Sequence, residues 1–377
     1  LCLFGEEVTP NQHAIARQFV LLDNTYASGT NSADGHQWTS SSVTNAYMEQ
    51  NYSSYARSYP YDGGDALAYS PKGFLWTAAA RRGLSVRVFG EFVNRPRIED
   101  TQNPNRKGLP SWTELWQDYR SGGKRYRIRA ETDNAQLRRF LDPECIGFPM
   151  NVSDQWRADR FLAEFRVWER TGRMPALTMI LLPTDHTAGT SPGMPTPRAT
   201  VADNDLAFGR IVDAISHSRF WPRTLILCIE DDSQLGVDHV DGHRTLAYCV
   251  SPYTRRNSVV STPYDQTGLV RTIGLVLGVP ALNEFDRAAR PMRECFQSVA
   301  DLRPFTHVPN RIPLDEMNKP VSALRGEAQH LARACAKLDW SDLDRANPTI
   351  VARAVWKAQK PSARFPAEMY TYEAKTE

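Results

Sequence analysis

The feature that most constrains the fold of this chain is a set of short apolar runs, rich in β-branched residues, separated by amphipathic segments. Such runs are typical of strands buried on both faces of a sheet. Segments 154–170 and 203–218 carry apolar residues at helical spacing, and Asp203 is the expected N-cap of the second. The expected strands are 19–22, 85–89, 177–182, 224–229 and 245–250.

Strands that alternate with helices predict an α/β fold, with a doubly wound, mostly parallel sheet and helices on both faces. The chain has 377 residues, of which 41% are hydrophobic, so it is long and apolar enough for a large core. We expect a main domain over residues 1–313 and a polar insertion at about 94–147 that caps the site. A mostly helical extension over 314–377 is expected to pack on that domain.

Composition excludes several classes of function. The net charge of +2 provides no overall field for nucleic acid, and the Arg-rich segment 120–129 is interpreted as a solvated edge strand or loop rather than a polyanion site. No apolar run reaches the ~18 residues of a membrane span. The cysteines lack the CxxC spacing of a zinc site. We expect Cys228 and Cys249 to be buried thiols. Whether Cys145 and Cys295 form a disulfide is left open by the sequence.

Acidic and histidine side chains follow several of the expected strands. Asp23 follows the first run, Asp185 and His186 follow the run at 177–182, and three acidic residues at 230–232 follow the run at 224–229. In open α/β sheets, ligands bind at the carboxyl ends of the strands. The sequence therefore predicts a site at this edge of the sheet.

Segment 229–243, IEDDSQLGVDHVDGH, combines five carboxylates with two histidines. Carboxylate and imidazole ligands suit Zn²⁺, Mn²⁺, Mg²⁺ or Ca²⁺, so Asp231 and Asp232 are candidate metal ligands. Asp185, His239 and His243 are further candidates. The alternative interpretation of the segment is a solvated acidic turn.

Segment 31–38, NSADGHQW, offers Ser32 as a nucleophile, with His36 four residues later. It contains no GxSxG pattern, so a nucleophile elbow is not indicated. A serine can also be activated by direct coordination to a metal ion. An ordinary loop serine is the alternative.

Segments 9–38 (TPNQHAIARQFVLLDNTYASGTNSADGHQW) and 225–240 (LILCIEDDSQLGVDHV) resemble a bacterial phosphoesterase family of phospholipases C and acid phosphatases within the alkaline-phosphatase superfamily. The resemblance places Ser32 on the nucleophile and His36 on a basic position, while Gly35 replaces the usual Asn. It also assigns metal-ligand roles to Asp231 and Asp232.

The resemblance implies hydrolysis of phosphate esters through a phosphoserine at Ser32, which would also contact a divalent metal. His186 is implied as a second catalytic residue, which either protonates the leaving group or, with His239 or His243, holds a second metal ion. Asp185, His239 and His243 are implied as second-metal or phosphate contacts. Arg255 or Arg256 either clamps the phosphate or forms a structural ion pair. The implied substrate is a small phosphate ester or a phospholipid.

The family has an earlier strand that ends in an acidic metal ligand, and this chain opens after it, at LCLFGEEVTP, without a signal peptide. That opening is interpreted as the interior of a longer protein, with an N-terminal domain before it. The resemblance implies a periplasmic or secreted location. The alternatives are a pseudo-enzyme that lacks the strand, a phosphosugar mutase, and a sulfatase, although the (C/S)xPxR pattern of sulfatases is missing.

Overall fold

The computed structural model describes residues 3–29, 31–51, 59–233, 241–341 and 345–366. The helices are α1 (Pro10–Gln18), α2 (Ser32–Ser41), α3 (Ala46–Asn51), α4 (Leu75–Arg81), α5 (Trp112–Arg120), α6 (Asp154–Thr171), α7 (Pro197–Ser216), α8 (Gln266–Leu277), α9 (Glu284–Ala288), α10 (Gly326–Cys335) and α11 (Pro348–Gln359). The strands are β1 (Val20–Tyr26), β2 (Val86–Phe89), β3 (Arg95–Asp100), β4 (Tyr126–Glu131), β5 (Leu177–Ile180), β6 (Ile226–Ile229), β7 (Arg244–Val250), β8 (Ser258–Val260) and β9 (Tyr264–Asp265).

All five expected strands are present, as β1, β2, β5, β6 and β7, and both expected helices form. The predicted N-cap of α7 is wrong. The helix begins at Pro197 and is capped by Thr196, because proline at the first position favours a helix start there. Asp203 is buried within α7, where its carboxylate accepts hydrogen bonds from the Ser153 hydroxyl (2.8 Å) and the Asp154 N–H (2.7 Å). Asp203 therefore holds the start of α6 against α7.

The larger sheet is mixed, so the expectation of a mostly parallel sheet is wrong. Its order is β6-β7-β1-β8, with β9 also paired to β1. Strand β7 runs antiparallel to β6 and β1, while β8 and β9 run parallel to β1. The physical reason is connectivity: β7 follows β6 in sequence and pairs directly beside it without a crossover, which only an antiparallel pair allows.

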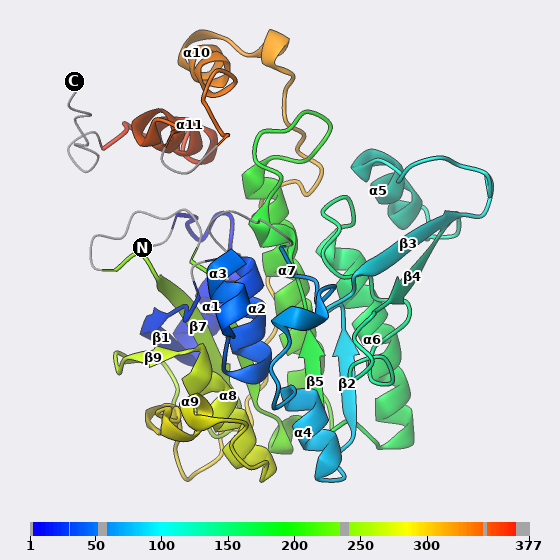
Figure 1. The fold of residues 1–377 in the computed structure, drawn as a ribbon, viewed down its shortest axis with the longest axis vertical. Helices are drawn as coiled ribbons and strands as arrows, with labels where there is room; N and C mark the ends of the chain where they lie inside the picture. The colour runs from blue at the N-terminus through cyan, green and yellow to red at the C-terminus, as the bar shows by residue number, and fades with distance from the viewer. Residues whose placement is uncertain (1–2, 30, 52–58, 234–240, 342–344, 367–377) are drawn as a thin grey trace.

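Helices cover both faces of the sheet, as predicted (Figure 1). The side chains of β7 alternate between two cores: Tyr248 and Val250 pack with α1, α6 and α7, whereas Ala247 and Cys249 pack with α4 and α8. This alternation is the period of a strand that is buried on both faces.

The sheet is interrupted between β5 and β6. Strand β5 pairs with β2 in a separate parallel ladder, and within the described residues β5 and β6 have no other strand partner. A cavity of about 1750 Å³ opens between them, lined by residues 174–183, 185–190 and 222–233 and by residues of α7, α8 and α11. The site described below lies at one end of this cavity.

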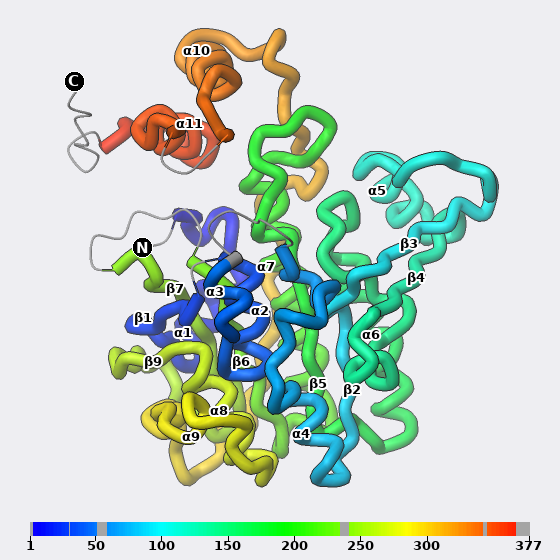
Figure 2. Tube along the Cα trace, viewed as in Figure 1, coloured from blue at the N-terminus to red at the C-terminus, as the bar shows by residue number. Residues whose placement is uncertain are grey.

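An arm formed by β3, β4 and α5 projects from the body of helices and sheet, and the helix pair α10–α11 lies at one end of that body (Figure 2). Helix α11 contacts α7 and lines part of the cavity. Arg127 and Arg129 lie on the exposed face of the hairpin β3–β4, in agreement with a solvated edge strand. None of residues 94–147 is among the described residues that line the cavity. No helix in the described ranges is long and apolar enough to cross a bilayer.

The structure answers the question of the Cys145–Cys295 disulfide and, for Arg256 alone, the question of the arginine role. Cys145 and Cys295 are free thiols buried in different cores, so they form no disulfide. Cys249 is buried as expected, whereas Cys228 is only half-buried because it lines the cavity. Arg256 pairs with Asp301 (3.3 Å) and stacks on an aromatic ring, which is a structural role.

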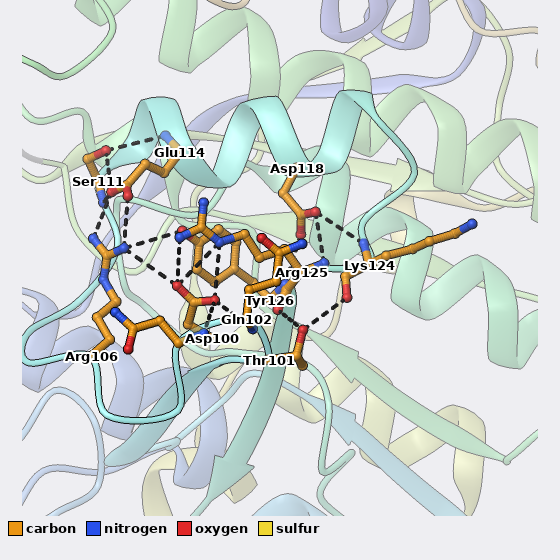
Figure 3. A network of polar contacts seen from close by, with 11 residues as sticks. Asp100, Thr101, Gln102, Arg106, Ser111, Glu114, Asp118, Lys124, Arg125 and Tyr126 are labelled. Atoms are coloured by element: carbon orange, nitrogen blue, oxygen red, sulfur yellow. Dashed lines mark hydrogen bonds and ion pairs between the residues drawn. The ribbon is translucent and has the colours of Figure 1, made fainter.

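A polar network holds the arm together (Figure 3). The Asp118 carboxylate accepts hydrogen bonds from the backbone N–H groups of residues 124–126. The Asp100 carboxylate accepts a bidentate hydrogen bond from Arg125, with a distance of 2.7 Å between Nη2 and Oδ2. The hydrogen bond from Arg125 lowers the pKa of Asp100 to about 2.

We predict that Asp100→Asn destabilises the chain at pH 7, because the amide cannot accept both Arg125 hydrogen bonds as a carboxylate does. The pKa of Asp100 is lower in the folded state, so its contribution is present above pH 4 and is lost as the pH falls through about 2. The difference in urea midpoint between the two proteins should therefore shrink from pH 5 to pH 2. Glu99→Gln, at the exposed neighbouring position, should show no such trend.

Candidate active site

Ser32 is the first residue of α2, and its side chain is nearly buried. Asn31 caps the helix by accepting the N–H groups of residues 33 and 34. The Ser32 Oγ donates a hydrogen bond to Asp232 Oδ2 (2.9 Å), which lies beyond the end of β6. A nucleophile placed at a helix N-terminus faces a region that favours anions, because N–H groups and the helix dipole point toward it.

His36 lies one helical turn after Ser32 and is held between two carboxylates. Its Nδ1 contacts Glu91 Oε1 (2.9 Å), and its Nε2 lies 3.6 Å from Asp231 Oδ2. Burial alone lowers the pKa of His36, but the charge and hydrogen bond of Glu91 outweigh it and raise the pKa to about 9. His36 is therefore a buried cation at neutral pH, and its Nε2–H points toward the end of β6.

The spacing between α2 and β6 depends on a glycine. A Cβ at Gly35 would lie 1.9 Å from the carbonyl oxygen of Asp231, so any side chain here would push the helix away from the strand end. Gln266 fixes the same backbone from the other side. Its Nε2 donates to Asp231 O (2.5 Å) and Glu230 O (3.1 Å), while its Oε1 accepts the Ser28 N–H (2.7 Å).

Asp185 and Glu230 form a carboxyl pair beside the first cluster, at the ends of β5 and β6. Glu230 donates a hydrogen bond to Asp185, and burial followed by the neighbouring Asp185 charge raises the pKa of Glu230 well above its ordinary value. Burial and the shared hydrogen bond thus favour the protonated form of Glu230. The Asp185–Glu230 contact brings together the ends of β5 and β6, two of the strand ends that the sequence predicts to meet.

The remaining candidates are less closely joined to Ser32. His186 lines the cavity from the short helix η2 (Thr184–His186), with its ring edge-on to Phe148 (5.0 Å). His243 contacts Asp241 (3.0 Å) and is not among the described residues that line the cavity. His239 lies outside the described residues. Asp23, predicted at a strand end, lies inside β1, because that strand continues to Tyr26.

The described residues of the site fit a divalent cation in chemistry but not in arrangement. Asp231, Asp232, Asp185 and Ser32 offer oxygen ligands around one cavity. Across the described parts of the chain, however, no group of three or more His, Cys, Asp or Glu side chains has the arrangement to hold a metal ion. The described residues therefore do not complete a metal site by themselves.

Sequence reasoning missed two residues of the site. Glu91 follows β2, so the strand-end rule that identified Asp185 also applies to it. Gln266 is the first residue of α8 and acts through backbone carbonyls, and nothing in its local sequence signals that role.

No protein-family model and no curated protein matches this chain. Among solved structures, it is similar to a protein in the alkaline phosphatase superfamily from Vibrio parahaemolyticus (15% identity, TM-score 0.47, 79% of this chain and 68% of that chain). It is also similar to the phosphonate monoester hydrolase SpPMH from Silicibacter pomeroyi (13% identity, TM-score 0.46, 78% of this chain and 72% of that chain). A third similar structure is the PsFucS1 sulfatase from Pseudoalteromonas sp. (14% identity, TM-score 0.44, 94% of this chain and 86% of that chain).

These similarities concern the fold at low identity, and they assign no family, nucleophile or substrate to this chain. The functional argument therefore rests on the side chains at the carboxyl ends of the strands.

We predict that Gly35→Ala separates Ser32 from Asp232, because the added Cβ collides with the Asp231 carbonyl. Overpacking of this kind costs about 1–3 kcal/mol of unfolding free energy. Urea unfolding should show a loss in that range. Gly5→Ala, where a Cβ meets nothing within 4 Å, is the matched control. Equal stability of the two variants would contradict the close packing of α2 on β6.

Proposed function

We propose that this chain is a phosphate-ester hydrolase in which Ser32 is the nucleophile. The observation that carries the proposal is the Ser32–Asp232 hydrogen bond at the N-terminus of α2, with the His36–Glu91 pair one turn further along the same helix. A nucleophile in contact with a base, beside a cation held by a third group, is the arrangement expected for nucleophilic catalysis.

The proposed reaction has two steps. The Ser32 oxygen bonds to phosphorus as its proton passes to Asp232, and the phosphorus–oxygen bond to the alcohol breaks. The alkoxide takes a proton from a neighbouring acid, for which His36 and His186 are the candidates. Water then attacks the phosphoserine, and a proton of this water returns to the acid that protonated the alcohol. Asp232 gives its proton back to the Ser32 oxygen, which restores the hydroxyl and releases inorganic phosphate from a monoester substrate or a phosphate monoester from a diester.

The carboxylate groups at the site support a requirement for a divalent cation. Among the described residues, the carboxylates of Asp231, Asp232 and Glu91 gather around His36, and carboxylate oxygens are ligands that hard divalent cations prefer. Zn²⁺, Mn²⁺, Mg²⁺ and Ca²⁺ all accept these ligands. The steps above use only groups of this chain, because the described residues do not complete a metal site.

The finer parts of the proposal rest on the resemblance in segments 9–38 and 225–240. They are membership of the phospholipase C and acid phosphatase family, a phosphate-ester or phospholipid substrate, and a periplasmic or secreted location. The rival proposal is a pseudo-enzyme that keeps the fold but lacks a metal ligand.

We predict that Ser32→Ala lowers hydrolysis of nitrophenyl phosphate by roughly 10³-fold or more, because the covalent route is lost. The assay compares a monoester, a diester and nitrophenyl sulfate, after chelation and after addition of each of the four cations. Loss of the hydrogen bond to Asp232 should lower the free energy of unfolding by only about 1 kcal/mol, so the variant should stay folded.

Ser40→Ala is the matched control, because Ser40 lies in the same helix and its hydroxyl bonds only to backbone carbonyls among the described residues. Full activity of Ser32→Ala would reject Ser32 as the nucleophile. No turnover by the unmodified chain with any cation would favour the pseudo-enzyme, and faster cleavage of the sulfate would favour a sulfatase.

A further inference from the structure

Three aromatic rings form a row beside the candidate active site. The ring of Phe148 lies edge-on to that of His186, with centroids 5.0 Å apart and planes at 89°. It also lies edge-on to the ring of Tyr61, at 5.1 Å and 67°. Phe148 and His186 line the same cavity as Ser32. Tyr61 and Phe148 are half-buried and His186 is exposed, so this aromatic row (Tyr61, Phe148 and His186) is open to a ligand.

One end of the aromatic row is joined to the carboxyl pair of the site. His186 directly follows Asp185, which accepts the hydrogen bond from Glu230 at the end of β6. His186 Nδ1 donates a hydrogen bond to the carbonyl of Thr187 (2.9 Å), which fixes the orientation of the imidazole ring. Thr187 has a φ of 60°, a conformation that is rare for a non-glycine residue and is concentrated at functional sites.

The other end of the aromatic row is joined to His36. Gly63, two residues after Tyr61, lies against Phe92, because a Cβ at Gly63 would lie only 2.6 Å from the Phe92 ring. The ring of Phe92 lies 6.2 Å from that of His36. Burial raises the pKa of Asp62, and the nearby charge of His36 offsets part of that rise. These contacts place segment 59–65 along the rim of the site.

The backbone that carries Phe148 is fixed by a buried arginine. Arg157 donates hydrogen bonds from Nε (3.0 Å) and Nη2 (2.7 Å) to the carbonyl of Gly147, and from Nη1 to the carbonyl of Val152 (2.6 Å). On the opposite side, a Cβ at Gly147 would lie 2.7 Å from the carbonyl oxygen of Gly90, directly after β2. The middle ring of the row is therefore held in place rather than carried on a loose loop.

We propose that the aromatic row is the subsite for the alcohol part of the ester and that it selects an uncharged aromatic ring there. The inference rests on the proposed function, in which Ser32 attacks phosphorus from α2. In an in-line displacement the leaving oxygen lies opposite the attacking oxygen. The aromatic row borders the site from segments outside α2, and its member His186 is already a candidate for the acid that protonates the alcohol. The leaving alcohol therefore lies against the rings of Phe148 and Tyr61.

The geometry of the aromatic row favours a ring over an aliphatic group or a cation. Each edge-to-face contact between aromatic rings strengthens an interaction by about twofold to tenfold beyond the effect of the buried area. An aliphatic group of the same size buries the same area without that contact. A cation binds over ring faces. Phe148 is perpendicular or nearly so to both of its neighbours, so the row presents edges as well as faces and does not form a cage of faces.

The test compares the binding of benzylphosphonate and cyclohexylmethylphosphonate to the full chain. The two ligands share the phosphonate group and a six-membered ring, and a carbon–phosphorus bond replaces the ester bond, so neither is hydrolysed. Binding is measured by calorimetry in the presence of each of Zn²⁺, Mn²⁺, Mg²⁺ and Ca²⁺. We expect benzylphosphonate to bind about threefold to tenfold more tightly, because only its ring makes edge-to-face contacts.

Phe148→Leu tests the protein side of the same contacts. Leucine keeps an apolar side chain but removes the ring, so the preference for benzylphosphonate should fall below about twofold. Phe285→Leu is the matched control, since Phe285 also lies edge-on to a neighbouring ring, that of Trp38 (5.5 Å), but is not among the described residues that line the cavity. The control should keep the full preference. If Phe148→Leu does not fold, Tyr61→Leu replaces it and should lower the preference in the same direction.

The matching esters, benzyl phosphate and cyclohexylmethyl phosphate, connect the subsite to turnover. Both release primary alcohols of similar acidity, so the ratio of their kcat/KM values should follow the same preference and be lost in Phe148→Leu. Absence of turnover, with the phosphonate preference intact and dependent on Phe148, would reject the hydrolase and keep the row as a ring-binding subsite. Equal binding of the two phosphonates, binding of neither, or tighter binding of a trimethylammonioethyl phosphonate would overturn the subsite itself.

Discussion

The site depends on the contact between the backbone of α2 and the carbonyl of Asp231. At Gly35 the helix lies so close to the end of β6 that no Cβ fits, and this closeness brings Ser32 within hydrogen-bond distance of Asp232. The same contact sets the position of His36, one turn later, against Asp231 and Glu91. Gln266 ties the strand end to the loop that precedes α2 and so keeps the two parts in register.

Among the described residues, several acidic side chains gather around that contact. Burial and repulsion by neighbouring carboxylates raise the pKa values of Asp185 and Glu230, and the charge and hydrogen bond of Glu91 stabilise the charged form of His36. These adjustments keep several carboxyl groups close together at the ends of three strands. Such an arrangement is unfavourable without a role for the charge, which is the physical reason to regard it as a site rather than as decoration.

The strands, helix α6 and the edge of the sheet that carries the site could be predicted because each has a local signal. For the strands and the helix the signal is an apolar pattern, and for the site it is an acidic residue directly after a strand. The direction of β7 could not, since pairing beside β6 is a non-local choice that the run at 245–250 does not encode. The start of α7 was misplaced because Asp203, a good capping residue, makes its hydrogen bonds to α6 instead. In the sequence Gly35 is a departure from the family motif, whereas the structure shows that only a glycine fits at this position.

The most direct test of the central claim is to find where phosphate resides during turnover. The chain is quenched with acid while it hydrolyses a nitrophenyl phosphate ester in the presence of a divalent cation, and its peptides are then mapped by mass spectrometry. The account predicts one phosphate group on the peptide that contains Ser32, at Ser32 itself. Sustained turnover with phosphate on another residue, or with no phosphorylated peptide under conditions that trap the intermediate, would contradict it.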